Sequence, residues 1–183
     1  YNGLPHQHPI CGETCTDGAH TGEDDILTWI GVSSLSEITG AGNYYLTQDV
    51  ETTGWTVPTT TEGVNLCLNG HKITSTAATA ITVNYLNTFT LTDCNGENKV
   101  YHFSDDSSQW KLAENGKQEI TGGVINYTGS GSGNAVGVAG EGKFYMYGGT
   151  ISGNSSSGVT VNSKATFTMH GGAIKGNISS SSS

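Results

Sequence analysis

The chain has 183 residues, of which 34% are hydrophobic, and its seven lysines, absent arginines and sixteen carboxylates give a net charge of −9. A phosphate backbone requires clustered cations, so this charge balance disfavours nucleic acid and anionic membrane surfaces as partners. No segment approaches the roughly 18 consecutive apolar residues of a spanning helix, which argues against membrane insertion.

Gly, Ser, Thr and Asn crowd the sequence, with 27 glycines alone. An aperiodic chain of this composition would be typical of disorder, but this sequence is periodic, which favours a thin, repetitive core. The low charge density and the missing arginines suggest a secreted or surface-displayed protein. Because the chain opens Tyr-Asn-Gly, without Met or a signal-like apolar run, we expect a processed piece of a longer protein.

Residues 1–42 form a lead-in that is rich in Cys and His, and residues 1–30 carry no repeat. Zinc prefers four ligands drawn from thiolates and imidazoles, and a bound metal can replace the hydrophobic core that this segment lacks. We therefore expect a structural zinc site here. A disulfide between the two cysteines of this segment is the alternative, because their C-x3-C spacing departs from the usual C-x2-C. The candidate ligands are His6, His8, Cys11, Cys15 and His20.

Residues 43–183 contain an internal repeat with an offset of 23 residues, clearest in the last two copies. The apolar residues alternate with polar ones over three to five positions, which predicts short strands with one buried face. Glycine pairs at 148–149 and 171–172 suit corners that need a positive φ or lack room for a Cβ atom. The matching pairs are Val136 and Val159, Val138 and Val161, Phe144 and Phe167, Met146 and Met169, Ile151 and Ile174, and Asn154 and Asn177.

Short strands, glycine corners and a fixed period predict an all-β fold, a right-handed parallel β-helix with coils of about 23 residues and about three strands per coil. Parallel strands joined by crossovers are right-handed in nearly all cases. In the same frame Leu66 and Leu68 align with Phe89 and Leu91. Gly122–Ile125 matches Gly148–Ile151 with an offset of 26.

One coil carries an insertion near residues 97–115, where two strand-like runs flank a polar turn, and we expect a β-hairpin that projects from the wall. Its exposed aromatic residues Tyr101 and Trp110, with Asp105, are candidates for binding glycans. The competing interpretation, that the aromatics pack the hairpin onto the wall, is favoured because isolated hairpins need support. Asp93, Asp105 and Asp106 make the best carboxylate cluster, although a solvated turn explains them better.

Cys67 and Cys94 form the second cysteine pair. In the 23-residue frame Cys94 aligns with His71, which leaves the two cysteines too far apart for a disulfide. Cys67 alternates with Leu66 and Leu68, so we expect it to point outward from the core. The sequence therefore favours two unpaired cysteines, unless the insertion bends the coil enough for them to pair.

Several segments resemble the right-handed β-helix repeat proteins of gut Firmicutes surfaces: VNLCLNGHKIT, ITVNYLNTFTLTDC, YMYGGTISGN and FTMHGGAIKGN. The N-terminal HPICGETC and SSLSEITGAGNYYLTQDV also resemble the segment that precedes the helix in those proteins. The resemblance covers nearly the whole chain and implies the fold, a bacterial origin and an extracellular setting. It supplies no function.

Two functions are compatible with these features. Pectin-type lyases of this fold rely on basic residues, arginine above all, and hydrolases need two carboxylates about 5 to 9.5 Å apart. The chain has no arginine, and residues 120–183 contain one carboxylate, Glu141. We therefore expect a non-catalytic structural or adhesive module. The last coil, through Ile174 and Asn177, carries no cap, which predicts self-association through solenoid ends or continuation into neighbouring repeats. A carbohydrate-active module, either a hydrolase subunit or a glycan binder, is the alternative.

Overall fold

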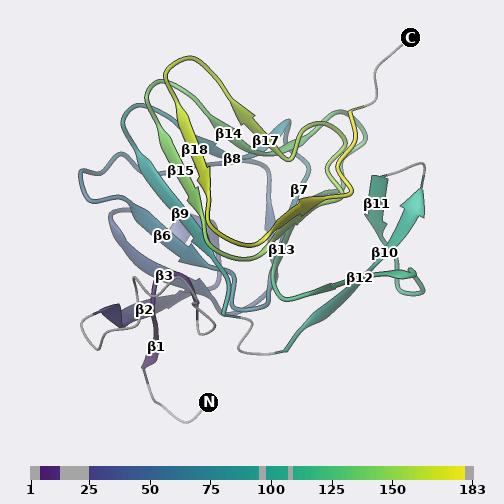
Figure 1. Cartoon of the computed structure of the whole chain (residues 1–183), viewed down its shortest axis with the longest axis horizontal. Coiled ribbons are helices and arrows are strands. Elements are labelled where there is room, and N and C mark those ends of the chain that lie inside the picture. Colours follow the sequence, from purple (N-terminus) through teal and green to yellow (C-terminus); the bar gives the residue numbers. More distant parts are fainter. Residues whose placement is uncertain (1–4, 13–24, 95–97, 107–108, 180–183) are drawn as a thin grey trace.

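The computed structural model describes residues 5–12, 25–94, 98–106 and 109–179 (Figure 1). These residues are all-β, with several sheets that are mostly parallel, and they include the short 3₁₀ turn Leu35–Glu37. Within the described ranges, no helix has the length and apolar character needed to cross a membrane.

Three sheets contain the parallel strands. A seven-stranded sheet has the order β1 (His6–His8), β2 (Leu27–Val32), β3 (Gly42–Leu46), β6 (Val64–Cys67), β9 (Thr88–Thr92), β15 (Lys143–Met146) and β18 (Thr166–Met169). A five-stranded sheet has the order β19 (Ala173–Lys175), β16 (Thr150–Ser152), β13 (Val124–Tyr127), β7 (Lys72–Ser75) and β4 (Val50–Thr52). A four-stranded sheet has the order β17 (Val159–Val161), β14 (Asn134–Val138), β8 (Thr79–Val83) and β5 (Trp55–Thr56).

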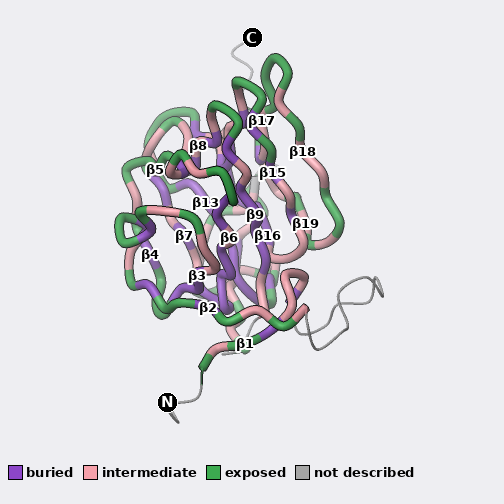
Figure 2. Tube along the Cα trace, turned by 90° about the vertical axis from the view of Figure 1, so that its left-hand side faces the viewer, coloured by how far each residue is buried: buried purple, intermediate pink, exposed green. Residues whose placement is uncertain are grey.

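The chain visits these three sheets in turn and then returns to the first. The strand sets β3-β4-β5, β6-β7-β8, β9-β13-β14 and β15-β16-β17 each contribute one strand to every sheet, and β18-β19 begins the next set. Figure 1 shows the three sheets around a shared interior. One hydrophobic cluster fills this interior with residues from all three sheets, such as Leu66, Ile73 and Ile81. Figure 2 shows the buried residues running along the strands while the connections are exposed.

The 23-residue register of the last two repeats is confirmed. Val136 pairs with Val159, Phe144 with Phe167, and Ile151 with Ile174. The phenylalanine rings stack, with centroids 5.6 Å apart between Phe89 and Phe144 and 5.0 Å apart between Phe144 and Phe167. The expected amide ladder also forms, because Asn154 Nδ2 donates to Asn177 Oδ1 over 2.7 Å. The Val124–Thr150 and Ile125–Ile151 pairs confirm the offset of 26.

The register expected for the preceding repeat is wrong by two residues. Leu66 lies opposite Leu91, and Val64 lies opposite Phe89, so the offset there is 25. The apolar alternation has a period of two, so a slip of two residues keeps every side chain on its own face. Sequence periodicity therefore could not distinguish the two registers.

Of the two reasons expected for the paired corner glycines, a positive φ applies to one glycine of each pair and a lack of room for a Cβ atom applies to the other. Gly149 and Gly172 have φ values of 81° and 83°, which disfavour residues with a Cβ atom. Their partners lack space instead, because a Cβ on Gly148 would lie 2.8 Å from Asp93 N and one on Gly171 would collide with Tyr147 O.

The insertion contains the expected hairpin, formed by β10 (Val100–Asp106) and β11 (Gln109–Leu112). It extends further than expected, because β12 (Gln118–Thr121) pairs with the other edge of β10. Phe103 and Ile120 of this antiparallel sheet are buried together with Val124 of the five-stranded sheet. The insertion is therefore packed onto the wall of the repeats.

Asp49 joins this insertion to the five-stranded sheet. Its carboxylate accepts hydrogen bonds from Tyr101 Oη at 2.9 Å and from Lys72 N at 3.1 Å, and Lys72 Nζ lies 3.0 Å away. Partial burial alone would raise the pKa of Asp49, but these hydrogen bonds and the lysine charge lower it from 3.8 to about 2.

We expect this carboxylate to contribute an acid-sensitive part of the stability. A depressed folded-state pKa stabilises the protein above the unfolded value, so the contribution of Asp49 is complete above pH 3.8 and is lost as the pH falls towards 2. Urea denaturation at a series of pH values measures the free energy of unfolding. Between pH 3.8 and 2 this free energy should fall more steeply with decreasing pH for the parent chain than for Asp49→Asn. Equal slopes in both proteins would contradict the assignment.

The two ends of the repeat region differ. At the N-terminal end, Leu35 and Ile38 are buried in the main cluster and cover it. At the other end, Val161, Met169 and Ile174 are 47%, 43% and 37% exposed, although their counterparts one repeat earlier are fully buried. Figure 2 shows this change in burial from β15 and β16 to β18 and β19.

Candidate metal centre

Four potential metal ligands meet on the outer face of the seven-stranded sheet: His6, His8, Cys67 and Cys94. Their ligand atoms all lie within 4.8 Å of one another. The histidines belong to β1, Cys67 ends β6, and Cys94 follows β9. The structure thus brings together an N-terminal strand and two repeats that are distant in the sequence.

Strand geometry places the two histidines on one side. Side chains at positions i and i+2 of a strand share a face, and β1 pairs antiparallel with β2, with His6 opposite Trp29 and His8 opposite Leu27. The His6 ring stacks on Tyr45 with centroids 4.1 Å apart. The His8 ring stacks on Trp29 at 4.4 Å. The aromatic rings hold both imidazoles in place.

The 25-residue register brings the two cysteines together. Because Cys67 lies opposite Thr92, Cys94 falls two residues beyond Cys67 and not four. The two Sγ atoms are 3.3 Å apart, and His6 Nε2 lies 3.5 Å from Cys94 Sγ. Neither cysteine is in a disulfide. The expectation that they lie too far apart is wrong, because it rested on the register that the structure corrects.

Cys67 points away from the main core, as expected, but it is fully buried. It belongs to a second small cluster with Trp29 and Tyr45, which the N-terminal strands cover. Burial raises the pKa of the Cys67 thiol well above its usual value, and the hydrogen bond with Cys94 adds to this effect. Without a nearby cation, this thiol is protonated.

One ring nitrogen of His8 is buried and makes no hydrogen bond with the described residues. Its Nδ1 lies 2.6 Å from Pro9 O, and a carbonyl oxygen only accepts hydrogen bonds, so Nδ1 is the donor. The side chain is 2% exposed, and Nε2 is buried with no hydrogen-bond partner among the described residues. Histidines that ligate metals typically donate the other ring N–H to a carbonyl or carboxylate in this way.

The metal-ligand set predicted from the sequence is only partly brought together. His6 and His8 are in the cluster, but Cys11 is disulfide-bonded and offers no thiolate, so its expected role as a ligand is wrong. Cys15 and His20 lie outside the described residues. The missed ligands Cys67 and Cys94 were visible in the sequence as a second cysteine pair. They were not assigned to one site because the sequence analysis used an offset of 23 residues between their repeats, whereas the offset is 25.

The candidate glycan-binding residues make contacts with the repeats. Tyr101 Oη donates to Asp49 and to Gly70 O, and the Trp110 ring lies under Lys175 Nζ at 5.0 Å from its centroid. Asp105 is exposed on β10. These contacts match the packing role that the sequence favoured for the two aromatics.

Two acids of the expected carboxylate cluster have separate hydrogen-bond or ion-pair partners. Asp93 accepts hydrogen bonds from Gly70 N and Gly123 N, each at 2.7 Å, and so connects two corners of the repeats. Asp106 lies on the hairpin and pairs with Lys111 Nζ at 3.2 Å. Both acids thus have local structural partners.

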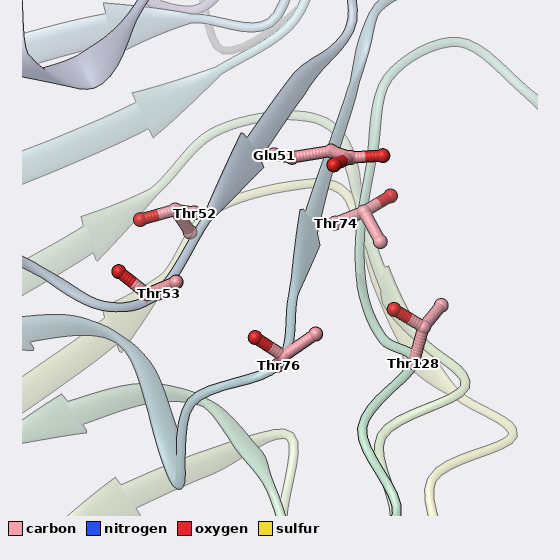
Figure 3. A pocket seen from close by; sticks show the side chains of 6 residues that line it. All are labelled: Glu51, Thr52, Thr53, Thr74, Thr76 and Thr128. Atoms are coloured by element: carbon pink, nitrogen blue, oxygen red, sulfur yellow. The ribbon is translucent and has the colours of Figure 1, made fainter.

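A groove of about 410 Å³ runs across the outer face of β4 and β7. Figure 3 shows its lining: Glu51, Thr52, Thr53, Thr74, Thr76 and Thr128. This lining provides hydroxyl groups and one carboxylate. Acid–base hydrolysis of a glycosidic bond needs two carboxylates, so this lining does not form a hydrolase site.

Comparison of the chain with family models, with curated proteins and with solved structures returned no match.

Proposed function

We propose that the three parallel sheets form a right-handed parallel β-helix. The support is the regular return of the chain to each sheet and the ladders of identical residues between successive strands. Crossovers between parallel strands are right-handed in nearly all known cases, which supports the hand.

On this fold we propose a non-catalytic structural or adhesive module of a bacterial cell-surface protein, related to the β-helix repeat proteins of gut Firmicutes. The sequence motifs support the setting, and the site geometry supports the absence of catalysis. Within the described residues, the groove provides one carboxylate and the hairpin aromatics are engaged in packing. A structural zinc ion is the cofactor we propose for this module.

The exposed ladder at the last described repeat carries this proposal. Val161, Met169 and Ile174 repeat the spacing of buried residues, and their apolar surface is available to a following strand set. Exposed edges with unpaired backbone groups readily pair with further strands. The occupant we propose is another parallel repeat of a longer chain. Leu35 and Ile38 cover the opposite end, which disfavours head-to-tail stacking of identical copies.

Adding one repeat to the chain tests this proposal. A second copy of residues 155–177, placed after residue 177, should bury Val161, Met169 and Ile174 and raise the melting temperature. Hydrogen exchange at the amides of β18 and β19 should slow down. In the control protein, the inward apolar residues of the added copy are replaced by serine. The proposal fails if the two extended proteins behave alike. It also fails if the parent chain self-associates through this edge.

A further inference from the structure

We infer that His6, His8, Cys67 and Cys94 bind one zinc ion, and that this ion fastens the N-terminal strand β1 to the outer wall of the repeats. The inference rests on the structural zinc proposed above, and it adds the ligands and the purpose of the ion. It replaces the local N-terminal site expected from the sequence with a site that spans the fold.

The donor set and its spacing suit zinc. Two sulfur and two imidazole donors form one of the standard structural zinc sets, with tetrahedral geometry. Bonds of about 2.0 to 2.3 Å in a tetrahedron separate neighbouring ligand atoms by about 3.3 to 3.8 Å. The His6–Cys94 distance of 3.5 Å suits a nitrogen and a sulfur bound to one ion. Two sulfurs at about 2.3 Å from zinc lie about 3.8 Å apart, so the Cys67–Cys94 distance of 3.3 Å must lengthen when the ion binds. Magnesium and calcium prefer oxygen ligands, and the group contains none.

The buried nitrogen of His8 is an independent indication of a ligand. A buried polar atom without a partner is costly, and native structures usually satisfy it. His8 Nε2 has no hydrogen-bond partner among the described residues. One ring nitrogen of His8 lies within 4.8 Å of the ligand atoms of the two cysteines and His6. A cation there would use this nitrogen, while Nδ1 keeps its bond to Pro9 O.

The ion would add a link between β1 and the wall of the repeats. β1 has three residues and pairs with β2 alone among the described strands. Binding through β1, β6 and the segment after β9 closes loops between residues 8 and 67 and between residues 6 and 94. All four coordination positions come from the protein, which is typical of a structural and not a catalytic site.

Charge and protons balance in this site. Each thiol releases one proton on binding, and two thiolates with two neutral imidazoles then neutralise the charge of one Zn²⁺ ion. A Cys67–Cys94 disulfide would remove both thiolates, so the metal-bound and oxidised states exclude each other.

Zinc titration of the full chain, purified under reducing conditions and freed of metal, tests the inference. We expect one bound ion per chain and a melting temperature higher by about 5 to 10 °C at zinc concentrations well above Kd. Cobalt in place of zinc should give the absorption of a tetrahedral thiolate site. Cys94→Ser and His8→Ala should each weaken affinity by more than the roughly 10- to 100-fold cost of losing an outer-shell partner.

His102→Ala is the matched control, because this imidazole is exposed on the insertion and lies outside the four-residue group. It should bind zinc as the parent chain does. If the Cys94 and His8 variants fail to fold, the cobalt spectrum of a parent chain in which the Cys11 disulfide is intact still decides. Absence of a thiolate band, or a Cys67–Cys94 disulfide that persists in reductant, would overturn the inference. Neither result bears on the edge of β18 and β19, whose hydrogen exchange tests the proposed function separately.

Discussion

Phe144→Ala should lower the free energy of unfolding by about 3 to 5 kcal/mol, as for other large-to-small changes of a buried aromatic. The Phe144 ring is fully buried and stacks between Phe89 and Phe167. Its removal leaves a cavity in the middle of the ladder, and two stacking contacts are lost at once. Urea denaturation followed by circular dichroism measures the change.

Phe167→Ala is the control for this prediction. It removes the same side chain from the same ladder, but at the last described repeat, where the ring is only half-buried and stacks on one neighbour. The loss should be clearly smaller than for Phe144→Ala. Equal losses would mean that the last repeat is covered in solution, which would also count against an available edge.

Gly123→Ala should lower the free energy of unfolding by about 1 to 3 kcal/mol, because the added methyl group overfills a corner. Its Cβ atom would collide with Leu68 Cβ and lie 2.9 Å from the carbonyl oxygen of His71. The backbone there is tied down, since Gly123 N donates to Asp93 Oδ2 over 2.7 Å. The neighbouring strands must therefore shift to accept one carbon atom.

Gly40→Ala is the matched control, since a Cβ atom at this position has no neighbour within 4 Å. The free energy of unfolding should change by less than about 1 kcal/mol, with either no effect or a small gain from a less flexible unfolded chain. If both alanine variants destabilise the protein equally, crowding at the corner is not the cause.

Half of the candidate metal centre could be predicted from the sequence. His6 and His8 were identified by residue type, because imidazoles close to cysteines indicate zinc. Cys67 and Cys94 were recognised as a pair but assigned to separate places, because the pairing offset of their repeats is 25 and not 23. Cys11 looked like a ligand by spacing, yet it is disulfide-bonded.

The sequence by itself determined the strands, the identical ladders of the last two repeats and the hairpin insertion. These features depend on short-range alternation and on a spacing that recurs, both of which can be read along the chain. Only the tertiary structure decided the register between β6 and β9 and the position of β1 over Cys67. The physical reason is that a two-residue slip preserves the buried face, and that contacts between distant segments leave no periodic signal. The metal centre depends on this register and on this position of β1.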